Sequence, residues 1–311
     1  MPRYRIHHLT RYTYDEAVSV CHNVAHLLPR DAPPPDRHTW HFADLDISPL
    51  PAVRTERRDY FGNRLTFFAI QEPHRELSVS ARSEVDITPP PPPSTDPGPP
   101  WELARDALRN PHQRAGGLDA FQYTFASPFI HISDDFRDYA LPSFAPGRPL
   151  VEAVLDLASR IYRDFKYDPK CTTVTTTLPE VLTARAGVCQ DFAHLAVGCL
   201  RSLGLAARYV SGYLMTVPPP GKPRLVGADA SHAWPSIYGP ALAADMSSSS
   251  GGAAEYGGWL DVDPTNNTRI SDQHITLAWG RDFGDVSPLR GVLLGTGRHA
   301  ITVSVDVVPI S

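Results

Sequence analysis

The chain is poor in cysteine and has no long apolar run. Its 311 residues include four cysteines, and no two of them form a C-x-x-C pair. So few and so scattered cysteines exclude a disulfide framework and argue against a structural zinc site. No apolar stretch reaches the roughly 20 residues that a membrane helix needs, and the N-terminus lacks the apolar segment of a secretory signal. We therefore expect a cytoplasmic protein.

The chain also lacks a large excess of positive or negative charge. The net charge is −5 and the sequence pI is about 6.2, with acidic and basic residues interspersed. This balance leaves no electrostatic footprint for nucleic acid or for an anionic membrane, so we expect neither as a partner. The hydrophobic fraction of 42% is that of a soluble globular protein. The length suits one large domain or two of ordinary size.

The first part of the chain is rich in strand-like segments. Residues 4–14, 65–70 and 77–87 combine β-branched and aromatic residues, and 77–87 alternates apolar and polar positions with a period of two. Such segments pack best as an antiparallel sheet or sandwich. We therefore predict a β-rich, sandwich-like N-terminal domain over residues 1–88.

Proline is abundant, and it gathers where the pattern changes. Of the 32 prolines, five run consecutively from Pro89 to Pro93 and three more follow by Pro100. Polyproline geometry makes such a segment a semi-rigid spacer. We assign residues 89–118 to a proline-rich linker and residues 119–311 to a second domain. The alternative is a long proline-rich loop inside one domain.

The pattern of the second domain predicts helices followed by strands. Apolar residues recur at helical spacing over 149–162, a short helix with an early proline is expected at 178–182, and another helix runs from Cys189 to about Leu203, closed by Gly204. Strands are expected at 206–214, 232–238, 258–262 and 299–308. This order predicts an α+β fold.

Cys189 is the most informative residue of the chain. It follows Gly187-Val188 and opens an apolar helix, where free backbone N–H groups and the helix dipole favour a thiolate. His232 and a carboxylate, Asp261 or Asp263, follow on two expected strands. Cysteine, histidine and aspartate in this arrangement suggest a thiol nucleophile, a general base and a group that orients the base.

Spacing alone does not choose between the two carboxylates, because Asp261 and Asp263 share one strand face. Asp191 is a weaker candidate that we expect to support the start of the helix. His194 is expected to be structural, bonded to a backbone carbonyl. A metal site built from Cys189, His194 and His232 is a minor alternative.

The other three cysteines each have a plain structural interpretation. Cys199 lies in the middle of the expected helix, which predicts a core position. Cys21 and Cys171 are also expected to be structural, and Cys171 lies in a polar loop with no helix start to activate it. We therefore assign the nucleophile to Cys189 alone.

Three segments resemble the bacterial transglutaminase-like superfamily: 187–193 (GVCQDFA), 232–234 (HAW) and 259–266 (WLDVDPTN). The segment 201–213, the segment 280–288 and the β-rich N-terminal region also look like parts of that family. The resemblance implies a papain-like transglutaminase core and a catalytic triad of Cys189, His232 and Asp263, which favours Asp263 over Asp261. Two departures are residues 241–257, which look like an insertion, and Cys171, where a smaller or polar residue is expected.

The resemblance also implies a chemistry. Cys189 would attack the amide carbonyl of a peptide or protein and form a thioester, with its own N–H as one oxyanion donor. Hydrolysis, as in a peptidase or amidase, is favoured over cross-linking by an acyltransferase, and no cofactor is implied. The alternative is a non-enzymatic protein-binding module on the same fold.

Overall fold

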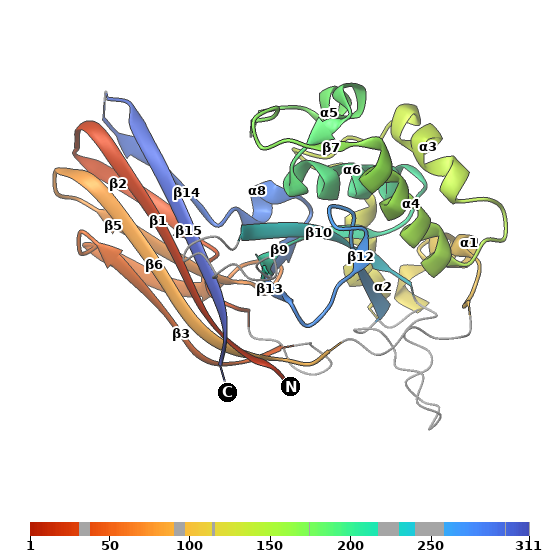
Figure 1. Ribbon diagram of the computed structural model, residues 1–311, viewed down its shortest axis with the longest axis horizontal. Helices are drawn as coiled ribbons and strands as arrows, with labels where there is room; N and C mark the ends of the chain where they lie inside the picture. Colours follow the sequence, from red (N-terminus) through yellow and green to blue (C-terminus); the bar gives the residue numbers. More distant parts are fainter. Residues whose placement is uncertain are drawn as a thin grey trace, which may run out of the picture.

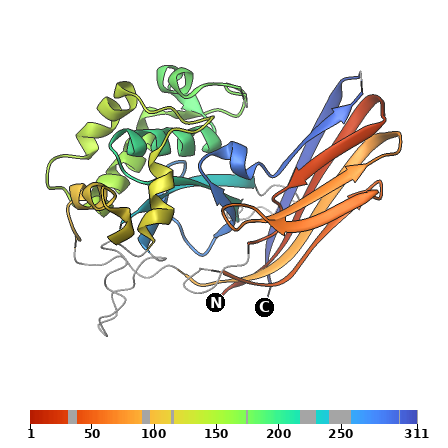
Figure 2. The ribbon, with the colours of Figure 1, turned by 180° about the vertical axis from the view of Figure 1, so that it is seen from behind.

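A β-sandwich and a helix-covered sheet lie side by side in this protein (Figures 1 and 2). The structure is a computed structural model that describes residues 1–30, 38–89, 97–113, 116–173, 175–216, 230–239, 258–295 and 297–310. Antiparallel sheets and helices occupy separate parts of the chain, so the α+β prediction is confirmed. The expected insertion at 241–257 and most of the consecutive prolines lie outside the described residues.

The sandwich consists of two four-stranded sheets with the orders β15-β1-β6-β3 and β14-β2-β5-β4. Its strands are β1 (Arg3–Val18), β2 (Val20–Ala25), β3 (His38–Ser48), β4 (Val53–Arg58), β5 (Arg64–Ile70), β6 (His74–Ile87), β14 (Leu289–Leu294) and β15 (His299–Ile310). The alternation seen at 77–87 is that of β6, whose odd-numbered residues from Leu77 to Ile87 are all buried. The two chain ends meet on one sheet, where Arg3 pairs with Ile310.

The last two strands of the chain belong to the sandwich and not to the second domain. β14 pairs with β2 and β15 pairs with β1, so the chain returns to the first sheets after the helical part (Figure 1). The assignment of everything from 119 to 311 to one core therefore needs correction. The reason is that strand periodicity reports which face is buried but not which sheet the strand joins.

The predicted linker over 89–118 also needs correction. Residues 101–107 form α1 (Trp101–Ala107), whose Trp101 and Ala104 are buried in the core of the helical part. The Trp101 ring meets Phe144 edge to face at a centroid distance of 5.5 Å. Residues 101–107 of the assigned linker are thus a packed helix, and the described part of the proline-rich spacer is residues 89 and 97–100.

The helical part packs several helices on a mixed-length antiparallel sheet with the order β12-β11-β10-β9-β13. Its helices are α1, α2 (Gly117–Phe121), α3 (Asp134–Ala140), α4 (Leu150–Asp164), α5 (Leu178–Ala184), α6 (Cys189–Ser202) and α8 (Phe283–Val286), with 3-10 turns at Pro111–Gln113, Gln122–Thr124 and Leu141–Ser143. The strands of this sheet are β9 (Ala207–Leu214), β10 (Ala230–Tyr238), β11 (Trp259–Asp263), β12 (Thr268–Arg269) and β13 (His274–Gly280). Two short strands, β7 (Lys166–Tyr167) and β8 (Ala186–Gly187), form a separate parallel pair.

Helix α6 is the centre of this part. Every residue from Asp191 to Arg201 is buried, because the helix lies between α3, α4 and α5 and the strands β9 and β10. The helix ends before Gly204, which has a left-handed φ of 81°. None of the helices in the described segments combines the length and apolar character of a membrane span.

The sandwich sheet that contains β1 contributes side chains to two hydrophobic clusters, one in the sandwich and one shared with the helical part. Near the far end of β1, Tyr14 and Val18 pack in the sandwich core, whereas Tyr4 and Ile6 pack with Tyr213 of β9 and other residues of the second sheet. Tyr4, Ile6 and Tyr14 lie on one face, since side chains alternate along the regularly paired part of the strand. The 16 residues of β1 are therefore long enough to contact two partners in succession.

A second contact joins the two parts at β13. Asn63, in the turn before β5, accepts a hydrogen bond from the Trp279 N–H at 3.0 Å and donates one to the Trp279 carbonyl at 2.8 Å. The guanidinium of Arg30 lies 3.3 Å from the centroid of the Trp279 ring. Asn63 is fully buried, so this side chain connects the sandwich to the strand that begins at His274.

Candidate active site

Cys189 is the first residue of α6, and the chain around it is shaped to begin a helix there. Val188 is extended, and the Asp191 carboxylate accepts its backbone N–H at 2.9 Å. A Cβ at Gly187 would lie 2.8 Å from the Asp191 Cβ, so glycine is required for this close approach. The same Asp191 oxygen accepts the Thr172 hydroxyl at 2.7 Å. Asp191 therefore stabilises the start of the helix, as the sequence suggested.

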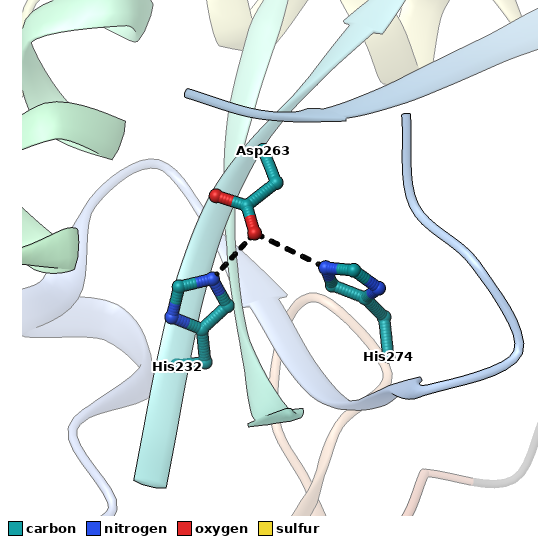
Figure 3. Close-up of side chains that lie close together, drawn as sticks. All are labelled: His232, Asp263 and His274. Carbon is teal, nitrogen blue, oxygen red and sulfur yellow. Dashed lines mark hydrogen bonds and ion pairs between the residues drawn. The ribbon is translucent and has the colours of Figure 1, made fainter. Parts of the chain in front are cut away.

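His232 and Asp263 come from neighbouring strands. β10 and β11 pair antiparallel, with Ser236 opposite Asp261, which brings the end of β11 beside His232. His232 Nε2 donates to Asp263 Oδ2 at 2.8 Å (Figure 3). Both side chains are almost completely buried.

The His232 ring is also hydrogen-bonded to the Cys189 side chain. Burial by itself would lower the pKa of His232, but hydrogen bonds to Asp263 and to the Cys189 thiol raise it to about 10. Because Nε2 is bonded to Asp263, Nδ1 is the nitrogen left for the sulfur. At neutral pH the arrangement thus favours an imidazolium between a carboxylate and a thiol group.

Asp263 is held by donors on both oxygens. Oδ1 accepts the backbone N–H groups of Thr265 and Asn266, at 2.9 and 3.2 Å, and Oδ2 accepts the Asn266 side-chain amide at 2.7 Å in addition to His232. Burial would raise the pKa of this carboxyl, but hydrogen bonds, those from His232 and His274 first, hold it well below its ordinary range. The carboxylate is fully buried and fixed in orientation.

Asp261 is hydrogen-bonded to Trp234 and not to His232. Its Oδ2 accepts the indole N–H of Trp234 at 3.2 Å, and no contact with His232 is seen. Of the two carboxylates that spacing left open, Asp263 is therefore the one that the structure brings to His232.

His274 is a member of the cluster that sequence reasoning missed. It begins β13, is 4% exposed, and its Nε2 lies 3.1 Å from Asp263 Oδ2 (Figure 3). His274 comes from β13, which is separated from β11 in the sheet by β10 and β9, so no local spacing in the sequence could have indicated the contact. Asn266 was part of a recognised motif, but its bond to Asp263 was not predicted.

Among the described residues, His232, Asp263 and His274 are the group close enough together to hold a metal ion, with ligand atoms within 4.8 Å of one another. The hydrogen bonds do not fit a metal. The backbone N–H of Ser271 donates to His274 Nδ1 at 3.1 Å, which places the proton of a neutral ring on Nε2, the atom a metal would need. The other grouping considered, with His194, does not form: His194 Nε2 instead accepts the Phe283 N–H at 3.1 Å.

The remaining predicted residues make contacts of their own. Cys21 and Cys199 are buried, and burial raises the pKa of both thiols, that of Cys199 to about 12. Cys171 is exposed and donates to the Asp168 carbonyl at 3.1 Å. His194 is buried, which lowers its pKa to about 4, but its bond is to a backbone N–H and not to the expected carbonyl.

Comparisons with known proteins show which family the chain belongs to. A family model for the bacterial transglutaminase-like N-terminal region matches residues 4–86, and one for the transglutaminase-like superfamily matches residues 138–264. An uncharacterized protein of Mycobacterium tuberculosis is 46% identical over 311 residues, covering 99% of this chain and 93% of its own. The chain belongs to the transglutaminase-like superfamily. An uncharacterized protein of Mycobacterium leprae is 31% identical over 313 residues, covering 99% of both chains.

The transglutaminase-like fold also has a solved counterpart. A "putative cysteine protease" from Cytophaga hutchinsonii superposes with a TM-score of 0.71 at 19% identity, over 100% of this chain and 91% of that one. At this identity the likeness concerns the fold. It supports the predicted transglutaminase-like core with a sheet-rich N-terminal domain, and all three matched motifs of the sequence lie inside or at the edge of the superfamily match.

Proposed function

We propose that this transglutaminase-like protein is a thiol-dependent amidase or peptidase that acts through Cys189, His232 and Asp263. The observation that carries the proposal is the 2.8 Å bond between His232 Nε2 and the buried Asp263, which directs the other ring nitrogen to a cysteine at a helix start. The description of the Cytophaga hutchinsonii protein as a "putative cysteine protease" agrees with this chemistry.

In the first half of the reaction, the Cys189 thiolate attacks the carbonyl carbon of an amide. The oxygen becomes an oxyanion near the N–H groups of the first turn of α6, including that of Cys189, which have no partners within the helix. When the C–N bond breaks, the departing nitrogen takes a proton from the His232 imidazolium. The amine leaves, and the acyl group remains on Cys189 as a thioester.

In the second half, neutral His232 takes a proton from water as the water oxygen attacks the thioester carbonyl. The C–S bond breaks, the acid is released, and the thiolate and imidazolium are restored. An amine in place of water would give transfer of the acyl group. We favour hydrolysis, and we propose peptide or protein amides as the substrate class.

The proposal can be tested without a known substrate by using p-nitrophenyl acetate, an activated ester that acylates reactive thiols. We expect a burst of about one equivalent of p-nitrophenolate, followed by slower turnover, and an acetyl group on Cys189 by mass spectrometry. Cys189→Ala should abolish the burst, whereas Cys171→Ala, which removes an exposed thiol that does not start a helix, should keep it.

Adding a primary amine to the same reaction separates the two acceptors. Release of acetate even with amine present supports hydrolysis, whereas acetylation of the amine as the main product would favour an acyltransferase. An unchanged burst in Cys189→Ala, or no acylation of the wild-type protein, would contradict the mechanism and favour a binding module.

A further inference from the structure

His274 approaches Asp263 from a different strand of the sheet than His232 does. It begins β13, across β9 and β10 from the strand that bears Asp263. Figure 3 shows its ring on the opposite side of Asp263 from His232, with both rings pointing at the same carboxylate oxygen. The ring also meets the Trp234 indole edge to face, at a centroid distance of 5.4 Å and an angle of 88°. Its position is therefore constrained by packing as well as by hydrogen bonds.

The hydrogen bonds of His274 determine where its proton is. The Ser271 backbone N–H can only donate, so His274 Nδ1, at 3.1 Å, must accept with its lone pair. The ring proton then lies on Nε2 and is donated to Asp263 at 3.1 Å. While both bonds are kept, His274 is a neutral donor. Of the two histidines bonded to Asp263, His232 is therefore the one that carries the balancing positive charge.

From this geometry we infer that His274 is a positioning residue for the proposed reaction: it acts through Asp263, holding the carboxylate ionised and aimed at His232. The inference rests on the proposed function. A neutral donor stabilises the Asp263 carboxylate by a hydrogen bond and adds no second positive charge beside the His232 imidazolium. Among the described residues, the titratable groups that act on Asp263 and His232, besides each other, are His274 on Asp263 and Cys189 of α6 on His232.

Two substitutions separate this role from a purely structural one. In His274→Gln the side-chain amide N–H₂ group can replace Nε2 as a donor to Asp263, but it leaves no acceptor at the position of Nδ1. In His274→Asn the carbonyl oxygen can still accept the Ser271 N–H, but the side chain is too short to reach Asp263. If His274 acts through Asp263, the Gln variant retains reactivity and the Asn variant loses it. A role confined to holding the turn before β13 predicts the reverse.

The readout is the rate at which iodoacetamide alkylates Cys189, followed by mass spectrometry across the pH range. We expect His274→Asn to slow alkylation near pH 6 by about tenfold or more and to move the acidic limb of the profile upward by about one pH unit. His274→Gln should stay within about threefold of the wild type. Thermal unfolding of both variants shows whether each remains folded at the assay temperature.

The outcomes separate the two claims. If the wild-type Cys189 is alkylated quickly near pH 6 and both variants match it, or if only the Gln variant is impaired, the role of His274 is overturned and the proposed function stands. If the wild-type Cys189 itself reacts as an ordinary thiol, the proposed function fails, whatever the variants show.

Discussion

At the scale of single residues, the site depends on which of two similar aspartates meets His232. Asp261 and Asp263 share a strand face, and only the three-dimensional arrangement separates them: Asp261 accepts from the Trp234 indole, and Asp263 accepts from His232. Five hydrogen bonds from protein groups end on Asp263, which explains how a fully buried carboxylate stays ionised.

This difference predicts unequal effects of the same isosteric change. Asp263→Asn should reduce the acylation rate of Cys189 by p-nitrophenyl acetate roughly 10³–10⁴-fold, because an amide neither balances the imidazolium nor fixes its orientation. Asp261→Asn is the matched control and should stay near the wild-type rate, since the amide oxygen can still accept from Trp234. Stopped-flow measurement of the burst gives both rates. Equal losses in the two variants would show that Asp263 has no special role.

The motifs predicted Cys189, His232 and Asp263 because each lies in a short segment with a recognisable pattern. His274 and Asn266 had no such signal for their contacts. Whether Asn266 bends back to the carboxylate three residues earlier depends on the turn after β11, and the His274 contact depends on how the sheet curves. Side chains that meet only through tertiary structure are invisible to periodicity and spacing.

At the scale of elements, helices were the most predictable. The helical spacing at 149–162 corresponds to α4 (Leu150–Asp164), and the helix expected from Cys189 to about Leu203 is α6. Proline in the first turn of α5 and glycine after α6 set their ends by backbone geometry alone. These signals are local, so one sequence is enough to read them.

Strands were predicted less completely. β1, β6, β9 and β10 were expected close to where they lie, but β13 (His274–Gly280) was not identified as a strand. Its burial pattern alternates irregularly, because a bulge between Thr276 and Ala278 breaks its register with β9. The membership of β14 and β15 in the sandwich was likewise missed, since strand pairing across more than 200 residues leaves no local trace.

At the scale of the whole molecule, the sandwich and the helical part share one sheet face, and His8 lies where they meet. It is 1% exposed, its Nδ1 is 2.9 Å from the Tyr213 hydroxyl of β9, and its Nε2 is 3.0 Å from Thr10 Oγ1. Burial lowers the pKa of His8 to about 4. The contact between the two parts should therefore depend on pH.

The sign of this dependence follows from proton binding. Between about pH 6.5 and 4 the unfolded chain protonates His8 and the folded one does not, so the free energy of unfolding falls as the pH is lowered through this range. The loss attributable to His8 is at most about 3 kcal/mol. Below that range both states are protonated and the contribution is constant.

His8→Gln tests this by keeping a neutral group that can both donate and accept. We expect the free energy of unfolding, from urea titrations at several pH values, to decline less steeply between about pH 6.5 and 4 in the variant than in the wild type. His194, whose pKa is also lowered to about 4, is present in both proteins and cancels in the comparison. Parallel curves for the two proteins would show that His8 does not titrate in this way.

The most direct test of the account compares two cysteines within one protein. Iodoacetamide alkylation is measured against pH, with mass spectrometry resolving Cys189 from the more exposed Cys171. If Cys189, His232 and Asp263 form a nucleophilic site, Cys189 should react faster than Cys171 near pH 6, although it is less accessible. If instead Cys189 lags behind Cys171 at every pH, and both react only as the pH nears about 8.5, then Cys189, His232 and Asp263 do not work together as a nucleophilic site.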